Sequence, residues 1–500
     1  MFMDEHRGKV WDEIRQQDSR LLGKHLTTEV LGEAARRSNI TIGKSPLQAA
    51  NLVWLGVLAA LFPNKDFSSV LGMTLKLLAD QQGFGQTAIG RAQRQGERRK
   101  ARRKAKKKSG CGKKRPRSKH DPRQDDPTVV SEEAFTKARR RLPIAFWMAL
   151  LKVLNEGFEK VHGDQLCWKR FRLLALDGSC IDLDGWKRLR KHYGAAGRGK
   201  GRKKTQARMV MLQFPLTRLP YAYEVAPLAD GETTLAWRLA EHLRPDDLVL
   251  IDRGFFSYGL FCRLQEKGAY FGIRLKSGIK LQHVRSLGDQ DELVSWRPKH
   301  VRQKERLQDM PRKLELRVIH YQIPGFRPSA IVTNMTDPKQ ISREDWVRMA
   351  EKSPAGRALQ PGLYHRRWEI ETTFFELKVT QGMEKGLRSR TPKGIEYEIA
   401  GHVILYFLVR WLMLEAALEA ELDPLRVSFA GALRELEEIR ISLLTASPQW
   451  AQRILLPRLM QRVASHVVPL RPGRHFPRPN DTKIKDKGKG HKQLPAKLVA

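Results

Sequence analysis

Two short apolar segments, each followed by an aspartate, constrain the fold more than any other feature of the chain. They are residues 171–176, followed by Asp177, and residues 247–251, followed by Asp252. Apolar runs of this length, bounded by turn residues, predict buried strands. One aspartate after a strand is usually only a turn or cap residue. Two such strands, each leading into a glycine-containing turn, favour a mixed α/β core with a carboxylate at each strand tip.

The neighbouring segments predict further strands and helices of the same core. The predicted strands are 207–214, 221–225 and 270–275, and the predicted helices are 235–243, 255–267, 342–352, 396–421 and 429–443. The middle of the helix 396–421 is nearly all apolar, so we expect it to be buried. Three segments that alternate or are rich in β-branched residues, 281–284, 314–323 and 330–334, predict an antiparallel β insertion.

The region before the first strand is predicted to be helical. Helices are expected from Pro46 to Phe62, over 67–79, and over 131–160 with a restart at Pro143. They either contact DNA or simply form a hydrophobic core. The third helix carries Lys137, Arg139, Arg140 and Arg141. This basic face either follows a DNA backbone or is a solvated surface.

The charge of the chain predicts a polyanionic partner. The formal net charge is +39, which favours nucleic acid over the alternative of an anionic membrane surface. Residues 91–123 carry seventeen Lys and Arg against two acids, and the tail from Pro469 carries nine against two. Such segments cannot bury a core, so we expect them to be disordered tethers, with nuclear import a weaker alternative for 91–123.

The same composition predicts a cytoplasmic, nucleoid-associated protein without a membrane span. The longest apolar stretch, Ala49–Phe62, falls short of the ~20 residues that a span needs. The N-terminus lacks an apolar signal segment. The four cysteines form no Cys-x-x-Cys pair, which argues against a zinc finger or a disulfide framework.

Residues 364–378 contain no Gly or Pro and predict a half-buried helix. The apolar residues that interrupt its charges are Trp368, Phe374, Phe375 and Leu377. At ~100° per residue, one face within roughly 60° holds Tyr364, Arg367, Glu371 and Lys378. Glu369 and Glu376 point away from this face. A helix stabilised by ordinary i, i+4 ion pairs would show the same local pattern.

Three acids therefore stand out by context, namely Asp177, Asp252 and Glu371. A set of oxygen ligands without matching His or Cys suits Mg²⁺ or Mn²⁺ better than zinc. A pair of such ions ~3.5–4 Å apart can activate the attacking oxygen of a phosphodiester reaction and stabilise the leaving oxygen. Nearby cations would hold the phosphate.

These residues resemble the IS4 family of DDE transposases of bacterial insertion sequences. The spacing Tyr364-x2-Arg367-x3-Glu371-x6-Lys378 matches the signature of that family. Supporting matches, in family order, are Asp177-Gly-Ser for the first acid and Asp252-Arg-Gly-Phe for the second. The segment Gly231-Glu232 to Leu235 and Arg426-Val-Ser-Phe429 also resemble features of the family. The resemblance covers about residues 130–440, so the basic block and the tail lie outside it.

The resemblance implies an α/β fold with an RNase H-like catalytic core interrupted by a β-rich insertion, and an N-terminal helical DNA-binding region. The implied domains are 1–168 with a disordered basic segment 91–125, core 169–275, insertion 276–360, core 361–445, and a C-terminal region 446–500 with a basic tail.

The resemblance also implies a chemistry and a set of roles. Asp177, Asp252 and Glu371 would bind two Mg²⁺ ions, with Mn²⁺ as a substitute. The enzyme would cleave the terminal inverted repeats of its element and join the 3′ ends to target DNA, as a homodimer in the synaptic complex. Residues implied to bind phosphates near the cut are Tyr364, Arg367 and Lys378. Arg253 would either do likewise or pair with an acid. Trp296 is a candidate to hold a flipped base, although a Trp in a β insertion usually packs in the core.

Two other functions remain open from the residues alone. A non-catalytic DNA-binding protein derived from a transposase would keep the charge and the fold, but would be expected to lose one of the acids. A membrane-surface protein would explain the basic segments but not the three carboxylates.

Overall fold

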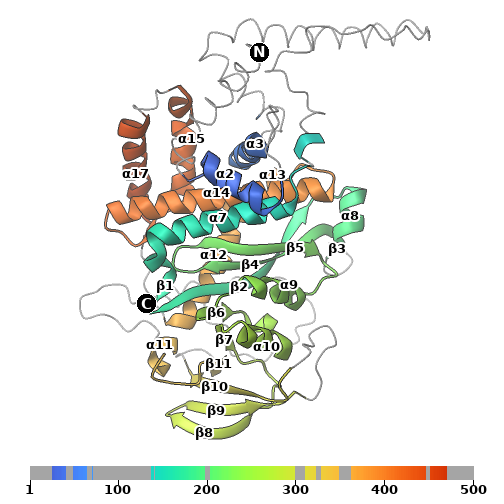
Figure 1. The fold of residues 1–500 in the computed structure, drawn as a ribbon, viewed down its shortest axis with the longest axis vertical. Coiled ribbons are helices and arrows are strands. Elements are labelled where there is room, and N and C mark those ends of the chain that lie inside the picture. Colours follow the sequence, from blue (N-terminus) through green and yellow to red (C-terminus); the bar gives the residue numbers. More distant parts are fainter. Residues whose placement is uncertain are drawn as a thin grey trace, which may run out of the picture.

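The chain forms a mixed α/β structure around one large sheet (Figure 1). The computed structural model describes residues 25–40, 49–64, 70, 137–139, 141–197, 203–298, 310–322, 328–347, 362–445 and 451–469. The predicted helix 67–79, apart from residue 70, the basic block 91–123 and the tail beyond residue 469 lie outside these residues. Within them, the strands order as β3-β4-β2-β6-β7-β11-β10-β9-β8, with β1 beside β2 and β5 beside β4.

The two predicted aspartate-tipped strands lie side by side at the centre of the sheet. They are β2, Phe171–Leu183, and β6, Asp247–Ile251, which run parallel. On one side β2 pairs antiparallel with β4, Lys204–Phe214, which pairs with β5, Leu219–Pro227. On the other side β6 is parallel to β7, Tyr270–Arg274. Because both central strands are covered on two faces, their apolar runs are continuous rather than alternating.

The first strand is longer than predicted, so Asp177 lies within β2 rather than at its tip. The parallel ladder with β6 ends at Leu176 and Ile251, but the antiparallel ladder with β4 continues to Leu183. The prediction that the strand ends at residue 176 is therefore wrong. Strand β2 extends past its apolar run because its backbone remains hydrogen-bonded to β4 as far as Leu183.

The antiparallel strands after β7 continue the same sheet. They are β8, Gln282–Gly288, β9, Asp291–Trp296, β10, Leu314–Tyr321, and β11, Ser329–Thr333. Strand β11 pairs with β7 and so joins this group to the centre. The sequence patterns did not predict β9. Trp296 ends that strand and is 6% exposed among Phe256, Tyr258 and Phe261. The burial of this ring favours packing in the core, and the base-holding role of Trp296 stays an untested prediction.

Helices cover both faces of the sheet (Figure 1). The long helices α7, Ile144–His162, and α14, Pro392–Glu419, pack against β5, and α9, Glu232–Leu239, packs on β4. Helix α10, Tyr258–Glu266, lies against β7. Pro143 precedes α7, as predicted. Helix α14 is long and apolar enough to cross a membrane, but it is buried inside the protein, as its apolar middle predicted.

The other described helices complete the layers. They are α2, Thr28–Arg37, α3, Ala49–Leu61, α8, Lys187–Tyr193, α11, Arg343–Val347, α12, Glu369–Phe375, α13, Met383–Gly386, α15, Phe429–Thr445, and α17, Leu456–Ser465. Helix α3 packs on α14, and α2 packs on α7. Arg139, predicted to lie on a basic face, instead lies 3.4 Å from the buried carboxylate of Glu398.

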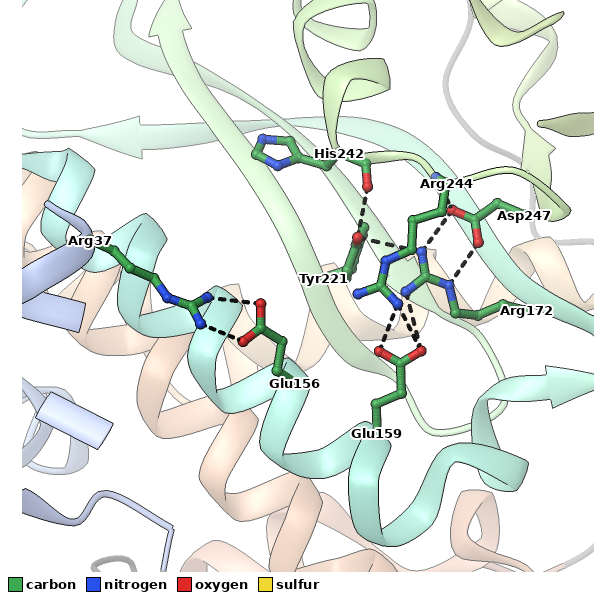
Figure 2. A network of polar contacts seen from close by, with 8 residues as sticks. All are labelled: Arg37, Glu156, Glu159, Arg172, Tyr221, His242, Arg244 and Asp247. Atoms are coloured by element: carbon green, nitrogen blue, oxygen red, sulfur yellow. Dashed lines mark hydrogen bonds and ion pairs between the residues drawn. The ribbon is translucent and has the colours of Figure 1, made fainter. Parts of the chain in front are cut away.

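A buried ion pair joins the starts of the two central strands (Figure 2). Arg172 of β2 donates two hydrogen bonds, of 2.7 and 2.8 Å, to the two oxygens of Asp247 of β6. These residues are also opposite each other in the ladder. Asp247 accepts a further bond from the Arg244 amide, and Glu159 of α7 lies 3.6 Å from Arg172. The pair thus fixes the register that brings Asp177 and Asp252 to the same level.

We predict that Asp247→Ala destabilises the protein by about 3–5 kcal/mol, because it leaves the Arg172 guanidinium buried without its partner. Urea denaturation measures the change in unfolding free energy. Glu156→Ala is the control: it removes the more exposed pair with Arg37, of 2.8 Å, and is expected to cost about 0–1 kcal/mol. Equal losses in the two variants would contradict the importance of the buried pair.

Candidate active site

Three carboxylates from distant parts of the chain surround one guanidinium. Arg367 Nη1 donates to Asp177 Oδ2 at 2.9 Å, and Arg367 Nη2 donates to Glu371 Oε1 at 2.9 Å. The same Nη2 lies 3.5 Å from Asp252 Oδ1. The structure therefore brings together the three acids that the sequence predicted, with Arg367 at their centre.

The sheet determines where the two aspartates lie. Leu176 and Ile251 are ladder partners, so Asp177 and Asp252 follow at the same level of neighbouring strands. Each carboxylate is also held by its own turn. The Gly178 amide donates to Asp177 Oδ1 at 2.7 Å, and the Gly254 amide donates to Asp252 Oδ2 at 2.9 Å. Both side chains are thereby oriented before any ligand arrives.

The segment that carries Arg367 and Glu371 is helical but not one regular α-helix. It begins as a 3-10 helix, Leu363–Trp368, continues as α12, and ends in a π-helical turn, Glu376–Thr380. The prediction of a single half-buried helix is wrong in this respect. Phe374 and Leu377 are buried as expected, but Trp368 and Phe375 are 51% and 58% exposed.

Tyr364 anchors this segment to the sheet. Its hydroxyl donates to the Ile251 carbonyl at 3.0 Å and accepts from the Arg274 amide at 3.2 Å. The side chain is 5% exposed, and burial raises the pKa of the phenol. The Tyr364 hydroxyl thus holds the backbone directly before Asp252. The expected contact between Tyr364 and DNA phosphate stays a prediction.

Lys378 fastens the other end of the segment to β2. Its Nζ donates to the Cys180 carbonyl at 2.6 Å and to Ser179 Oγ at 3.3 Å, and lies 3.1 Å from Glu384 Oε1. Glu384 in turn accepts from the Asp182 amide at 3.0 Å. Lys378 therefore lies along the strand beyond Asp177. Its predicted phosphate contact is untested, as is that of Arg253, which is exposed beside Asp252.

The two acids expected to point away from the site do so. Glu369 and Glu376 both bind Arg218, at 2.6 and 3.1 Å. Glu376 is also 7% exposed, accepts a 2.6 Å bond from Tyr406, and forms a buried ion pair with Arg410 of α14. Sequence analysis missed this structural role, although an arginine within the apolar part of α14 was a signal that a buried acid must pair with it.

Burial dominates the electrostatics of Asp177. Desolvation raises the pKa of this carboxyl to about 6, against the opposing effects of the Arg367 charge and the Gly178 amide. The side chain of Asp177 is 16% exposed, whereas those of Asp252 and Glu371 are 39% and 54% exposed. The site thus has one largely buried carboxylate and two that are more exposed to solvent.

The ligand types fit a hard divalent cation. The three acids offer carboxylate oxygens only, which Mg²⁺ and Mn²⁺ prefer. In the described part of the chain, no three acidic, His or Cys side chains are already placed to hold a metal ion, because the carboxylates are arranged around Arg367. A divalent ion would take over the charge compensation that this guanidinium provides.

Comparison with known proteins places this site in a family. Residues 168–408 match the family described as "Transposase DDE domain". The "Transposase InsG for insertion sequence element IS4" of Escherichia coli K12 is 28% identical over 281 residues, which cover 55% of this chain and 59% of that protein. Residues 168–408 therefore match a transposase DDE domain, and the chain is similar to a transposase of an IS4 insertion sequence.

Two further matches are more distant. The "Putative transposase InsZ" of the same organism is 26% identical over 28% of this chain and 48% of its own. The matches thus span roughly half of each curated relative. Among solved structures, a piggyBac transposase synaptic complex with hairpin DNA is 12% identical, covering 60% of this chain and 58% of that one. Its TM-score is 0.30, which supports no structural argument.

We predict that Glu376→Ala costs about 3–5 kcal/mol of stability, because it leaves Arg410 buried without its carboxylate. Glu369→Ala, on the same segment and also bound to Arg218, should cost about 0–1 kcal/mol because its side chain is 25% exposed. Denaturant unfolding of the two variants measures this difference. A Glu376 variant as stable as the Glu369 variant would show that the Arg410 pair is unimportant.

We also predict that Asp177→Asn stabilises the protein at pH above about 7. Because the folded-state pKa of about 6 exceeds the unfolded value of about 4, ionised Asp177 opposes folding, and the stability cost appears as pH rises through 4 to 6. The gain should be on the order of 1–3 kcal/mol at neutral pH and vanish near pH 4. Thermal unfolding across this pH range tests the prediction, and a gain independent of pH would contradict it.

Proposed function

We propose that the protein is a DNA transposase that cleaves the ends of its insertion sequence and joins the 3′ ends to target DNA. The observation that carries the proposal is the convergence of Asp177, Asp252 and Glu371 on Arg367. The match of residues 168–408 to the transposase DDE domain supports the reaction class. The three acids lie far apart in sequence, so an ordinary i, i+4 ion pair does not account for their meeting.

We propose further that the catalytic core is RNase H-like. Its support is the strand order β5-β4-β2-β6-β7, in which β4 is antiparallel to β2 while β6 and β7 are parallel to it. Strands β8 to β11 lie between Asp252 and Glu371 in sequence and would be the β-rich insertion. In this scheme the helical region before β1 contributes DNA binding.

Asp177, Asp252 and Glu371 would hold two Mg²⁺ ions, for which Mn²⁺ would substitute. When bound, such ions supply charge stabilisation at the attacking and leaving oxygens of a phosphodiester. The chain itself orients the ligands: Gly178 and Gly254 fix the two aspartates through their amides. Tyr364 restrains the backbone that precedes Asp252.

Arg367 would bind the DNA phosphate next to the cut. A planar guanidinium can donate two hydrogen bonds to one phosphate, and it remains charged at any working pH. In the structure these donors bind Asp177 and Glu371. Arg367 would exchange one of these carboxylates for a phosphate oxygen. Arg253 is exposed beside Asp252 and would contact a neighbouring phosphate, while Lys378 would do so from the β2 side.

The proposed partner is double-stranded DNA, both the element ends and the target. The net charge of +39 supports a polyanionic partner, and the three carboxylates favour a reaction on it over passive binding to a membrane surface. Joining two ends to one target requires two active sites, so we propose that a homodimer forms the synaptic complex.

Glu371→Ala should reduce Mg²⁺-dependent cleavage of the flanking element ends by roughly 10³-fold or more, because several kcal/mol of charge stabilisation are lost. Binding of the ends in a gel-shift assay should be largely retained. Glu369→Ala removes a carboxylate two residues away that binds Arg218 instead, and should keep its cleavage activity. Equal cleavage by the Glu371 variant and the parent would overturn the assignment. Binding without cleavage by the parent itself would favour a non-catalytic DNA-binding protein.

A further inference from the structure

A strip of contacts runs from the carboxylates along β2 to one end of the molecule. Arg367 meets Asp177, Lys378 meets Cys180, and Glu384 meets the Asp182 amide. At the far end, the Arg390 guanidinium lies 4.0 Å from the ring centre of Trp186. The chain from α12 to α14 therefore accompanies β2 continuously from the candidate active site to helix α8.

Helix α8 presents an exposed cationic surface at the end of this strip. Leu189 and Tyr193 are buried and fix the helix against the sheet, where α8 contacts β4 and β5. All other residues of the helix are exposed. We define the α8 surface by its exposed cations, which are Lys187, Arg188, Arg190, Lys191, Arg390 and Lys393.

Lys393 is the member of this set whose charge acts on a nearby acid, the carboxyl of Glu396. Among the residues that the structure describes, no carboxylate forms an ion pair with the four cations of α8. The nearby acid Asp182 is already paired with Lys204 at 2.7 Å, and Glu384 with Lys378 at 3.1 Å. Six cations on a rigid support, with an exposed Trp186 beside them, are suited to a polyanion.

The distance of the α8 surface from the three carboxylates fits a DNA duplex as its partner. From Asp177 to the end of β2 at Leu183 are six residues of extended strand, or ~20 Å. Duplex DNA advances ~3.4 Å per base pair, so this distance corresponds to about 6 base pairs. Helix α8 begins four residues after Leu183 and packs on β4, so a duplex whose axis follows β2 from the carboxylates would come to α8 near the end of that strand.

We propose that the α8 surface binds the DNA backbone about 6 base pairs from the scissile phosphate and so fixes the direction in which the duplex leaves the active site. The choice of DNA rests on the proposed function. The lysine and arginine side chains of this surface would contact phosphate oxygens. Contacts of this kind position the duplex but do not read its base sequence. The strip along β2 connects this contact rigidly to Asp177.

The test compares two variants with equal charge change in the full-length protein. Arg188→Glu with Lys191→Glu alters the α8 surface, and Lys152→Glu with Lys160→Glu alters two exposed lysines of α7. Affinity for a duplex of the flanking element end is measured without divalent ions over a range of salt concentrations. In the α8 variant the plot of log K against log salt should be shallower, with a slope smaller in magnitude by roughly 1.8. Each lost phosphate contact removes ~0.9 from that magnitude. The α7 variant should change it little.

Truncated duplexes locate the contact. When the duplex is shortened on one side of the cleavage position to fewer than about 6 base pairs, the difference between the α8 variant and the parent should disappear. An unchanged slope, an equal loss in the α7 variant, or a difference independent of duplex length would overturn the proposal. The proposal would also be overturned if the α8 variant lost binding to anionic phospholipid vesicles but bound DNA as well as the parent does.

The binding assay does not depend on catalysis. If the parent protein failed to cleave DNA with Mg²⁺ while the α8 variant still showed its length-dependent binding defect, the proposed function would fail and the α8 contact would stand. Thermal unfolding of both variants, expected to match the parent, confirms that neither substitution acts through folding.

Discussion

The structure depends on bringing three carboxylates together at one point, which is unfavourable unless a cation compensates them. Asp177 shows the cost directly, since burial raises its pKa to about 6 even with a guanidinium at 2.9 Å. Arg367 supplies the compensation in the described structure. A group of acids held this way is arranged for function rather than for stability, because uncharged residues of similar size would fold more easily.

The rest of the fold determines the positions of these groups from a distance. The Arg172–Asp247 pair sets the register of β2 and β6 five residues before the two aspartates. Tyr364 ties the helical segment to the Ile251 carbonyl, and Glu376 ties the same segment to Arg410 of α14. Together they restrain Glu371 relative to the sheet although its own carboxylate is largely exposed.

Much of the core could be predicted from sequence, because local apolar runs determine it. The bounds of β6 coincide with the predicted segment 247–251, and the three acids were identified from strand tips and helical spacing. The extension of β2 to Leu183 and the 3-10 and π-helical turns around α12 were not predictable, because pairing with β4 and contacts to Ile251 and Arg410 impose them. Trp296 remained a candidate to hold a flipped base because its hydrophobicity alone does not distinguish a ring packed in the core from one that binds a ligand.

The central claim is that Asp177, Asp252 and Glu371 form one divalent-metal site in the presence of DNA. Its most direct test is a Mn²⁺ titration of the full-length protein bound to a duplex of its element end, followed by electron paramagnetic resonance. The account predicts that two ions bind per active site and that Asp252→Asn greatly weakens their binding while DNA remains bound. Unchanged Mn²⁺ binding in that variant would contradict the account.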